Sequence, residues 1–307
     1  MPSAYPVAPR VIAGACALVV LAYFGILTPL LVLRAGYPAT AAWLAITSLA
    51  YAGFLGAVAA APATMQRALS GRTRLDLTDA GHVIALVLVV SALEYVFGNG
   101  LANGIYALEA TLRHVPQPDV TLTAGDVVLN IVVNVAVFVL PVLFYVSFVG
   151  RTGPSGALRE LGLAPEGAGR QMIVGLLVAA GFLAALIAAS ALLSRFVDIP
   201  ENQRALDIAR GLDVASALVV AAGAAVSEEV FFRGFLLPRV GLVGQALLFS
   251  AAHLSYVNAL EIVVTLALGL ALGLLRRRTG SLWGPIATHF AFDFLELMVA
   301  IYAPTST

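Results

Sequence analysis

Long apolar runs recur along the chain, and they constrain the fold more than any other feature. A helix needs about 20 consecutive apolar residues to cross a bilayer. Nine runs approach or exceed this length, at residues 11–33, 40–62, 82–98, 125–149, 171–194, 213–237, 241–256, 258–275 and 281–302. The third and seventh are short enough to be tilted, half-buried or re-entrant, so we expect about eight spans. Because a helix satisfies its own backbone hydrogen bonds in lipid, the sequence predicts an all-α, polytopic transmembrane helix bundle.

The composition agrees with a bilayer as the solvent. Hydrophobic residues make up 61% of the chain and charged residues 11%, whereas soluble domains carry about a quarter charged residues. The formal net charge is zero, so nothing points to a nucleic-acid partner. The single cysteine, Cys16, lies in an apolar run, which leaves no disulfide framework and no cysteine-based metal site to expect. We therefore expect membrane lipid, and no nucleic acid, around this chain.

The arginine distribution predicts the orientation of the bundle, because cytoplasmic loops of membrane proteins are rich in basic residues. With a cytoplasmic N-terminus and all nine runs crossing, eleven arginines fall on the cytoplasmic side and five on the outer side. The cytoplasmic set is Arg10, Arg67, Arg72, Arg74, Arg151, Arg159, Arg170, Arg239, Arg276, Arg277 and Arg278. The sequence thus predicts a multi-pass protein of the cell membrane with its N-terminus inside.

An ionisable cluster lies in the sixth run, in the segment SEEVFFRGFLLPRV. A charged side chain at the bilayer centre costs about 2.5–3.5 kcal/mol on insertion scales, so such residues usually have a function. Glu229 and Arg233 are four residues apart and share a helix face, whereas Glu228 points about 100° away. Arg233 can therefore keep Glu229 ionised, whereas burial would favour the protonated form of Glu228. General acid–base catalysis requires such a difference between two carboxylates. The alternative is a structural ion pair that holds helices together.

Two further polar motifs lie in the later runs. Phe249 precedes His253 by four residues, and His289 precedes Asp293 by four. Counting about 1.5 Å per residue from the cytoplasmic end of each run places the carboxylates and imidazoles of all three motifs roughly 12–18 Å deep. Unrelated core residues would not be expected to share one depth. The spacing therefore predicts one site that is open to the cytoplasm.

The three motifs occur together in a known family. They are EExxxR at Glu228–Arg233, FxxxH at Phe249–His253 and HxxxD at His289–Asp293. On these residues the chain resembles the CPBP family of intramembrane proteases, which includes the type II CAAX prenyl endopeptidases and the bacteriocin-processing and self-immunity proteins. The segment LRELGLAPEGAGRQ is also similar to the lead-in of the family's catalytic half. The resemblance implies N-terminal transmembrane helices without a motif over 1–157 and a catalytic transmembrane domain over 158–307.

The resemblance implies distinct roles for the residues of the first two motifs. Glu228 and His253 would together activate a water molecule for attack on a peptide carbonyl. Glu229 and Arg233 would hold the first motif in shape. The pair Glu228 and His253 would then carry the chemistry, with Glu229 and Arg233 as its support.

The last motif leaves more alternatives open. The resemblance implies that His289 and the residue at 293 stabilise the oxyanion or assist the base. The prenyl endopeptidases usually have Asn at this position, whereas this chain has Asp293, and an ionised carboxylate cannot donate a hydrogen bond to an oxyanion. Asp293 is therefore protonated, orients His289, or helps to bind a metal.

Metal dependence also stays open at this point. Members of the family are commonly named metalloproteases, and two histidines with carboxylates could hold Zn²⁺ with an open position. The candidate ligands are Glu228, His253, His289 and Asp293. The HExxH motif is absent, so the zincin geometry does not apply. We favour metal-independent glutamate chemistry.

Together the motifs predict an intramembrane endopeptidase that cleaves a membrane-associated or hydrophobic peptide or protein. Two other classes of function remain. A non-proteolytic scaffold or bacteriocin self-immunity protein could hold a partner in the same pocket. A proton-coupled transporter would also use buried Glu and His, although no inverted repeat supports it.

The other polar residues in the apolar runs are better explained by packing. We expect Glu94 to contact a neighbouring helix, and Asn130 and Asn134 to form interhelical hydrogen bonds. Glu261 and Glu296 are weaker candidates for residues that line the site.

Overall fold

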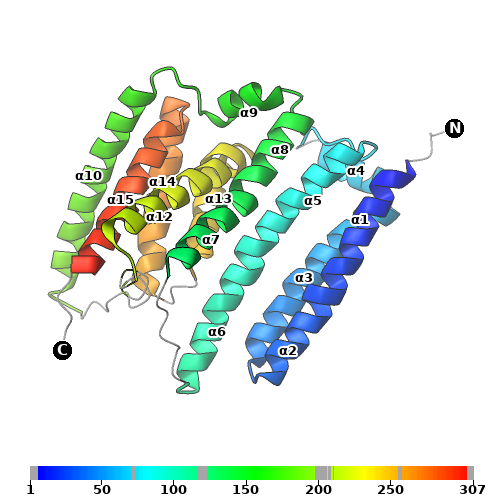
Figure 1. Cartoon of the computed structure of the whole chain (residues 1–307), viewed down its shortest axis with the longest axis horizontal. Helices are drawn as coiled ribbons and strands as arrows, with labels where there is room; N and C mark the ends of the chain where they lie inside the picture. The colour runs from blue at the N-terminus through cyan, green and yellow to red at the C-terminus, as the bar shows by residue number, and fades with distance from the viewer. Residues whose placement is uncertain are drawn as a thin grey trace. The chain divides into compact units, whose positions relative to one another are not determined.

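A computed structural model describes residues 6–70, 73–115, 123–197, 206, 209, 211–254 and 258–302 (Figure 1). These residues form helices, and no strand occurs among them. Eight helical stretches are long and apolar enough to cross a membrane: Val7–Arg34, Pro38–Ala60, Ala80–Leu112, Gly125–Val149, Ala168–Leu193, Val214–Ala252, Ala259–Thr279 and Trp283–Tyr302. The predicted all-α bundle of about eight spans is confirmed.

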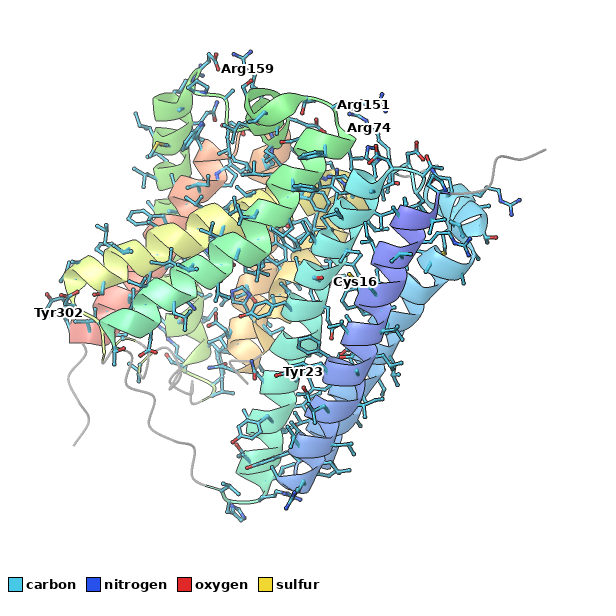
Figure 2. The ribbon with its side chains drawn as sticks, turned by 45° about the vertical axis from the view of Figure 1, so that its right-hand side comes forward. Cys16, Tyr23, Arg74, Arg151, Arg159 and Tyr302 are labelled. Atoms are coloured by element: carbon cyan, nitrogen blue, oxygen red, sulfur yellow. The ribbon has the colours of Figure 1, made fainter. Side chains whose placement is uncertain are left out.

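The chain divides into two compact units, and the first comprises Met1–Gln117, Leu140–Ala157 and Ala251–Val257. Its helices are α1 (Val7–Val19), η1 (Val20–Leu27), α2 (Thr28–Arg34), α3 (Pro38–Ala60), α4 (Pro62–Ser70), α5 (Ala80–Glu94), η2 (Tyr95–Asn99), α6 (Gly100–Leu112) and α8 (Leu140–Val149), where η denotes a π-helix. Helix α9 (Gly153–Leu161) begins in this unit and ends in the second. Figure 2 shows Cys16 on α1 and Tyr23 on the η1 segment that continues it.

Helix packing in the first unit uses both apolar and polar contacts. Ala17 of α1 packs with Tyr51 and Leu55 of α3 in one hydrophobic cluster. Glu94 Oε1 lies 3.2 Å from the hydroxyl groups of both Thr47 and Ser48, which belong to α3. Glu94 therefore joins α5 to a neighbouring helix, as its position in an apolar run predicts.

The second unit comprises Pro118–Val139, Leu158–Ser250 and Asn258–Thr307. Its helices are α7 (Ala124–Asn134), η3 (Val135–Val139), α10 (Ala168–Leu193), α12 (Val214–Glu228), η4 (Glu229–Leu236), α13 (Leu237–Ala252), α14 (Ala259–Thr279) and α15 (Trp283–Tyr302). The last two residues of α13, Ala251 and Ala252, belong to the first unit. In α7, Asn134 Nδ2 donates to Asn130 Oδ1 at 3.0 Å. The expectation of interhelical bonding was wrong for this contact, because side chains four residues apart lie close enough to bond along one helix.

Helices α12 and α15 run in opposite directions. Ala217, near the start of α12, packs in a cluster with Met298, near the end of α15. At the other end, a Cβ added to Gly234 would lie 3.3 Å from Leu282, just before α15. A tight turn at Gly280 (φ 68°) reverses the chain between α14 and α15. Helix α12 therefore runs parallel to α14.

The chain reverses again at Gly241. This residue has φ 79° and ψ 176°, a conformation that glycine adopts without steric cost. Beyond it, Gln245 Nε2 donates to the carbonyl oxygen of Gly269 at 2.8 Å, and the Ser250 hydroxyl donates to that of Ile262 at 2.8 Å. Later residues of α13 thus contact earlier residues of α14, so α13 runs antiparallel to α14. Since α12 runs parallel to α14, α13 also runs opposite to α12. The short seventh apolar run, residues 241–256, thus begins at this reversal, and its helical part belongs to the same stretch as the sixth run, Val214–Ala252.

Two hydrogen bonds join the segment before α10 to the start of α15. The backbone amide of Leu282 donates to Gly162 O at 2.9 Å, and Trp283 Nε1 donates to Ala164 O at 2.8 Å. Gly162 has φ 85°, so glycine suits the turn that ends α9. These bonds place the LGLAP segment, residues 161–165, against the last helix.

Asp213 caps the helix that leads to the ionisable motif. Its carboxylate accepts from the Ser216 backbone amide at 2.7 Å, the usual arrangement at a helix N-terminus. Hydrogen bonds from the Ser216 side chain and backbone lower the pKa of Asp213. Because its pKa is lowered, the Asp213 carboxylate stays ionised in mildly acidic solution. The stability that it contributes is lost only as the pH falls through the pKa of the folded state.

Helices α10 and α15 approach closely through small residues. Thr288 Oγ1 donates to Gly175 O at 2.8 Å and also lies 3.0 Å from Gly284 O. A Cβ on Gly175 would overlap with the backbone oxygen of Gly284. Small residues at such an interface let membrane helices pack backbone against backbone.

We expect Gly175→Ala to lower the free energy of unfolding by about 1–3 kcal/mol, the usual cost of overpacking. The matched control is Gly181→Ala in the same helix, because a Cβ there meets nothing within 4 Å and alanine favours the helix by about 1 kcal/mol. Thermal unfolding in detergent measures both. Equal effects of the two substitutions would contradict the close approach of α10 and α15.

Candidate active site

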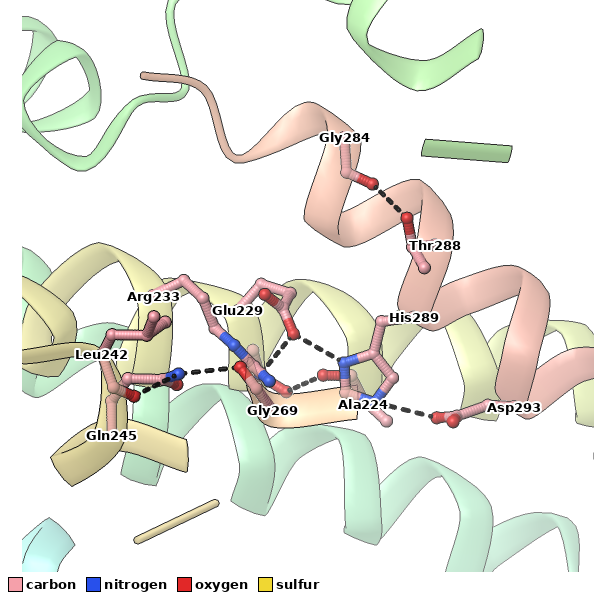
Figure 3. A network of polar contacts seen from close by, with 11 residues as sticks. Ala224, Glu229, Arg233, Leu242, Gln245, Gly269, Gly284, Thr288, His289 and Asp293 are labelled. Carbon is pink, nitrogen blue, oxygen red and sulfur yellow. Dashed lines mark hydrogen bonds and ion pairs between the residues drawn. The ribbon is translucent and has the colours of Figure 1, made fainter. Parts of the chain in front are cut away.

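The centre of the candidate site is the carboxylate of Glu229, which joins two helices (Figure 3). Its Oε1 lies 2.5 Å from Arg233 Nη1 and 2.8 Å from His289 Nδ1. Arg233 comes from the same π-helix, η4, whereas His289 comes from α15. The structure therefore brings the EExxxR and HxxxD motifs together, and the i,i+4 ion pair predicted from the spacing of Glu229 and Arg233 forms.

Arg233 is enclosed completely, with 0% of its surface exposed. Its guanidinium lies over the ring of Phe249, 4.1 Å from the centroid, a favourable cation–π geometry. The Phe249 ring also meets the His289 ring edge-on, with centroids 5.8 Å apart. Phe249 thus contacts both the cation and the imidazole.

His289 lies between two carboxylates. Its Nδ1 faces Glu229, and its Nε2 lies 3.3 Å from Asp293 Oδ2. Because both ring nitrogens have a carboxylate partner, the plane and tilt of the imidazole are set from both sides. His289 is 2% exposed, whereas the Asp293 side chain is 26% exposed. Asp293 is therefore the more accessible end of this network.

Glu228 is the last residue of α12, directly before the π-helix. It is half-buried, whereas Glu229 is fully buried. Glu228 also interacts electrostatically with Arg233. The two adjacent carboxylates thus have different surroundings, as their divergence on the helix predicts.

His253 lies in the turn directly after α13 and is half-buried. It belongs to the first unit with Ala251–Val257, whereas Glu228 belongs to the second. The pairing of Glu228 with His253 therefore stays a prediction from the motifs.

Two further carboxylates lie near the Asp293 end of the network. Glu296 interacts electrostatically with both Glu261 and Asp293. Glu296 lies three residues after Asp293 on α15, and Glu261 lies in the first turn of α14. The two glutamates thus interact electrostatically with each other, and Glu296 also with Asp293; that they line the site stays a prediction.

The sequence reasoning missed Gln245, whose side chain is fully buried. It bonds α13 to α14 at Gly269, and its carboxamide also lies against Gly273. Gln245 precedes Phe249 by four residues, so it continues the helix face of the FxxxH motif toward the chain reversal. That spacing was the signal that could have identified it.

The described residues offer few groups that could bind a metal ion. Among them, no group of three or more His, Cys, Asp and Glu side chains is arranged to hold a metal ion. The Nδ1 of His289 faces the same Glu229 oxygen that Arg233 contacts, and a guanidinium at that oxygen disfavours a cation there. The described residues therefore do not fit a metal centre at Glu229 and His289, and the ligand set of Glu228, His253, His289 and Asp293 stays a prediction from the motifs.

Comparison with known proteins identifies the region that carries these motifs. Residues 210–295 match the family model for type II CAAX prenyl endopeptidase Rce1-like proteins. The predicted resemblance is confirmed over this Rce1-like region, which includes every candidate residue from Glu228 to Asp293. In general terms, the match supports a CAAX-type intramembrane protease.

A curated relative matches a shorter stretch. Over 70 residues the chain is 37% identical to Uncharacterized protein YpbD of Bacillus subtilis (strain 168). This stretch covers 22% of the present chain and 37% of the relative. No solved structure matches the chain.

We expect Glu229→Ala to lower the free energy of unfolding by about 3–5 kcal/mol, because it leaves the buried Arg233 cation without its partner. The matched control is Glu166→Ala, which breaks an exposed pair with Arg159 at 3.6 Å and should cost about 0–1 kcal/mol. Chemical or thermal unfolding in detergent measures both variants. A loss for Glu229→Ala no larger than that for Glu166→Ala would contradict the buried network.

Proposed function

We propose that this chain is an intramembrane endopeptidase that cleaves a membrane-associated or hydrophobic peptide or protein. The observation that carries the proposal is the buried network of Glu229, Arg233, His289 and Asp293 within helices that can span a membrane. Ionisable groups are costly in a bilayer and usually functional there. The match of the Rce1-like region to a protease family supports a hydrolytic use of this polar centre.

In the proposed reaction, Glu228 is the general base, and His253 helps to hold and polarise the attacking water. The water oxygen bonds to the peptide carbonyl carbon while Glu228 takes the proton. The same proton then passes to the leaving amine as the C–N bond breaks. The different surroundings of Glu228 and Glu229 support this division, since Glu229 Oε1 is already engaged by Arg233 and His289.

Asp293 acts on the proposed chemistry through His289. Of the three roles open to it, the orienting role is supported by the 3.3 Å contact between Asp293 Oδ2 and His289 Nε2. A carboxylate beside an imidazole fixes the ring's position and tautomer. His289, held from both sides, then assists the base or stabilises charge on the substrate oxygen.

We further propose that the site opens to the cytoplasm. Within the first unit, Arg74 and Arg151 lie at the same end (Figure 2), and Asp76 interacts electrostatically with Arg151. Within the second unit, Arg276 Nη2 donates to Leu161 O at 3.2 Å, so the Arg276–Arg278 run lies at the end where α9 finishes. Clusters of arginine at one end of each unit support the positive-inside orientation.

We expect Glu228→Ala to reduce peptide hydrolysis at least about 100-fold, the contribution typical of a general base. The assay is cleavage of a membrane-peptide library by the purified full-length chain in detergent, with products identified by mass spectrometry. The control is Glu160→Gln, which changes an exposed glutamate on α9 and should leave the rate unchanged.

Equal rates for wild type and Glu228→Ala would rule out this mechanism. A scaffold or immunity protein would instead keep its cellular function in Glu228→Gln. Elemental analysis and chelator treatment of the same sample test the chemistry, because we expect cleavage to continue without bound zinc. Loss of cleavage with the chelator, restored by Zn²⁺, would replace glutamate chemistry with a metalloprotease mechanism.

Substitutions of Asp293 test its positioning role. We expect Asp293→Leu to lower kcat about 10–100-fold, the usual cost of losing an orienting partner, with KM little changed. Asp293→Asn keeps an oxygen that can accept from His289, so it should stay within about tenfold of wild type. Steady-state kinetics separate the two parameters. An Asn variant as slow as the Leu variant would mean that the charge of Asp293 is itself required.

A further inference from the structure

A pocket of about 440 Å³ opens in the first unit between α2, α3 and α6, and its lining includes no residue of the proposed chemistry. Its volume is within the range of small-molecule sites, which are mostly apolar with a few placed polar groups. The apolar part of its lining includes Val32, Leu44 and Ala102, and the polar part includes Tyr37, Asn103 and Tyr106. The pocket thus has two chemically different parts.

The pocket lies at one membrane surface. The spans Val7–Arg34 and Pro38–Ala60 are joined there by a short turn, and the span Ala80–Leu112 ends beside it. The 23 residues of Pro38–Ala60 extend roughly 35 Å, slightly more than the hydrocarbon thickness of about 30 Å. Pro38 is thus near the headgroup boundary, and Leu44 lies about 9 Å further along the helix, within the acyl chains.

The polar part is built around two tyrosines whose rings meet at a tilted angle of 52°. The rings of Tyr37 and Tyr106 lie 4.5 Å apart, and the Arg113 guanidinium lies over the Tyr37 ring, 5.7 Å from its centroid. Gly36 leaves room for this arginine, because a Cβ there would lie 2.9 Å from Arg113 Nη1. Tyrosine and arginine at a membrane boundary are typical of lipid headgroup contacts.

The charge at this end of the unit favours an anion. The carboxylate of Glu109 accepts from the backbone amides of Ala39 and Thr40 and from the Thr40 hydroxyl. These bonds hold the Glu109 carboxylate at the start of α3, and Arg113 also interacts with it electrostatically. Arg34, exposed at the end of α2, adds a second cation. Two arginines and one hydrogen-bonded glutamate leave a net positive charge beside the pocket lining, at this end of the unit.

We propose that this pocket binds one anionic phospholipid. Its phosphate lies at Arg113 beside the tyrosine pair, and one acyl chain lies along Val32, Leu44 and Ala102. The Asn103 amide donates to an ester carbonyl of the lipid, since an amide at this depth needs a polar partner. A membrane lipid is the occupant because the arginines at this end of the unit match its phosphate and the apolar lining matches an acyl chain. The proposal does not depend on the proposed hydrolysis.

Native mass spectrometry of the full-length chain tests the proposal, with phosphatidylglycerol and phosphatidylcholine titrated separately into the detergent. We expect one tightly retained phosphatidylglycerol and weaker retention of phosphatidylcholine. Arg113→Gln should weaken the phosphatidylglycerol affinity about fivefold, the effect of one cation near an anionic lipid surface. Asn103→Leu should weaken both lipids, because it removes the ester contact and keeps the side chain's bulk.

The matched control is Arg74→Gln, which removes an exposed arginine from the loop before α5 and should not change lipid retention. Circular dichroism and size-exclusion chromatography establish that each variant is folded. If Arg113→Gln does not fold, Asn103→Leu decides the result. Equal retention of the two lipids, or an Arg113→Gln or Asn103→Leu variant that retains lipid as Arg74→Gln does, would overturn the proposal.

Discussion

The buried contact between Glu229 and Arg233 is the constraint on which the rest of the second unit depends. Both side chains are fully enclosed, and removing two charges from water costs several kcal/mol for each ion. The cost is offset only where other groups complete the pair. His289 supplies a second contact to the Glu229 carboxylate, and Phe249 covers the guanidinium. Helices α13 and α15 must therefore stay in place for the charge pair to be stable.

The backbone meets this requirement through local departures from regular helix. The pair lies in the π-helix η4, and π-helical turns in α-helices frequently occur at functional sites. Gly241 then reverses the chain so that α13 can bring Phe249 back to Arg233. Close packing at Gly175 holds α10 against α15. Glycine is needed at both positions for different reasons, one for its φ and one for its missing side chain.

The same arrangement gives Glu229 and Glu228 different proposed roles, one structural and one catalytic. Glu229 is engaged on one oxygen by two partners, whereas Glu228 is half-buried at the end of α12. A network of this kind can hold the helix rigid around Glu228, the carboxylate proposed as the general base, and preorganised catalysis requires such rigidity. The Rce1-like region therefore contains both a stabilising core and the residues proposed to act on a peptide. The lipid pocket proposed in the first unit lies outside this region and uses a separate set of residues.

The sequence by itself determined the membrane helices, the pairing of Glu229 with Arg233, and the family resemblance, because apolar run length and i,i+4 spacing are local properties. It did not determine that His289 contacts Glu229 or that α13 folds back from Gly241 to bring Phe249 against Arg233. Those depend on how helices far apart in the sequence pack together. Only the tertiary structure could decide them, because burial, side-chain partners and close helix approach are set by contacts that residue spacing does not encode.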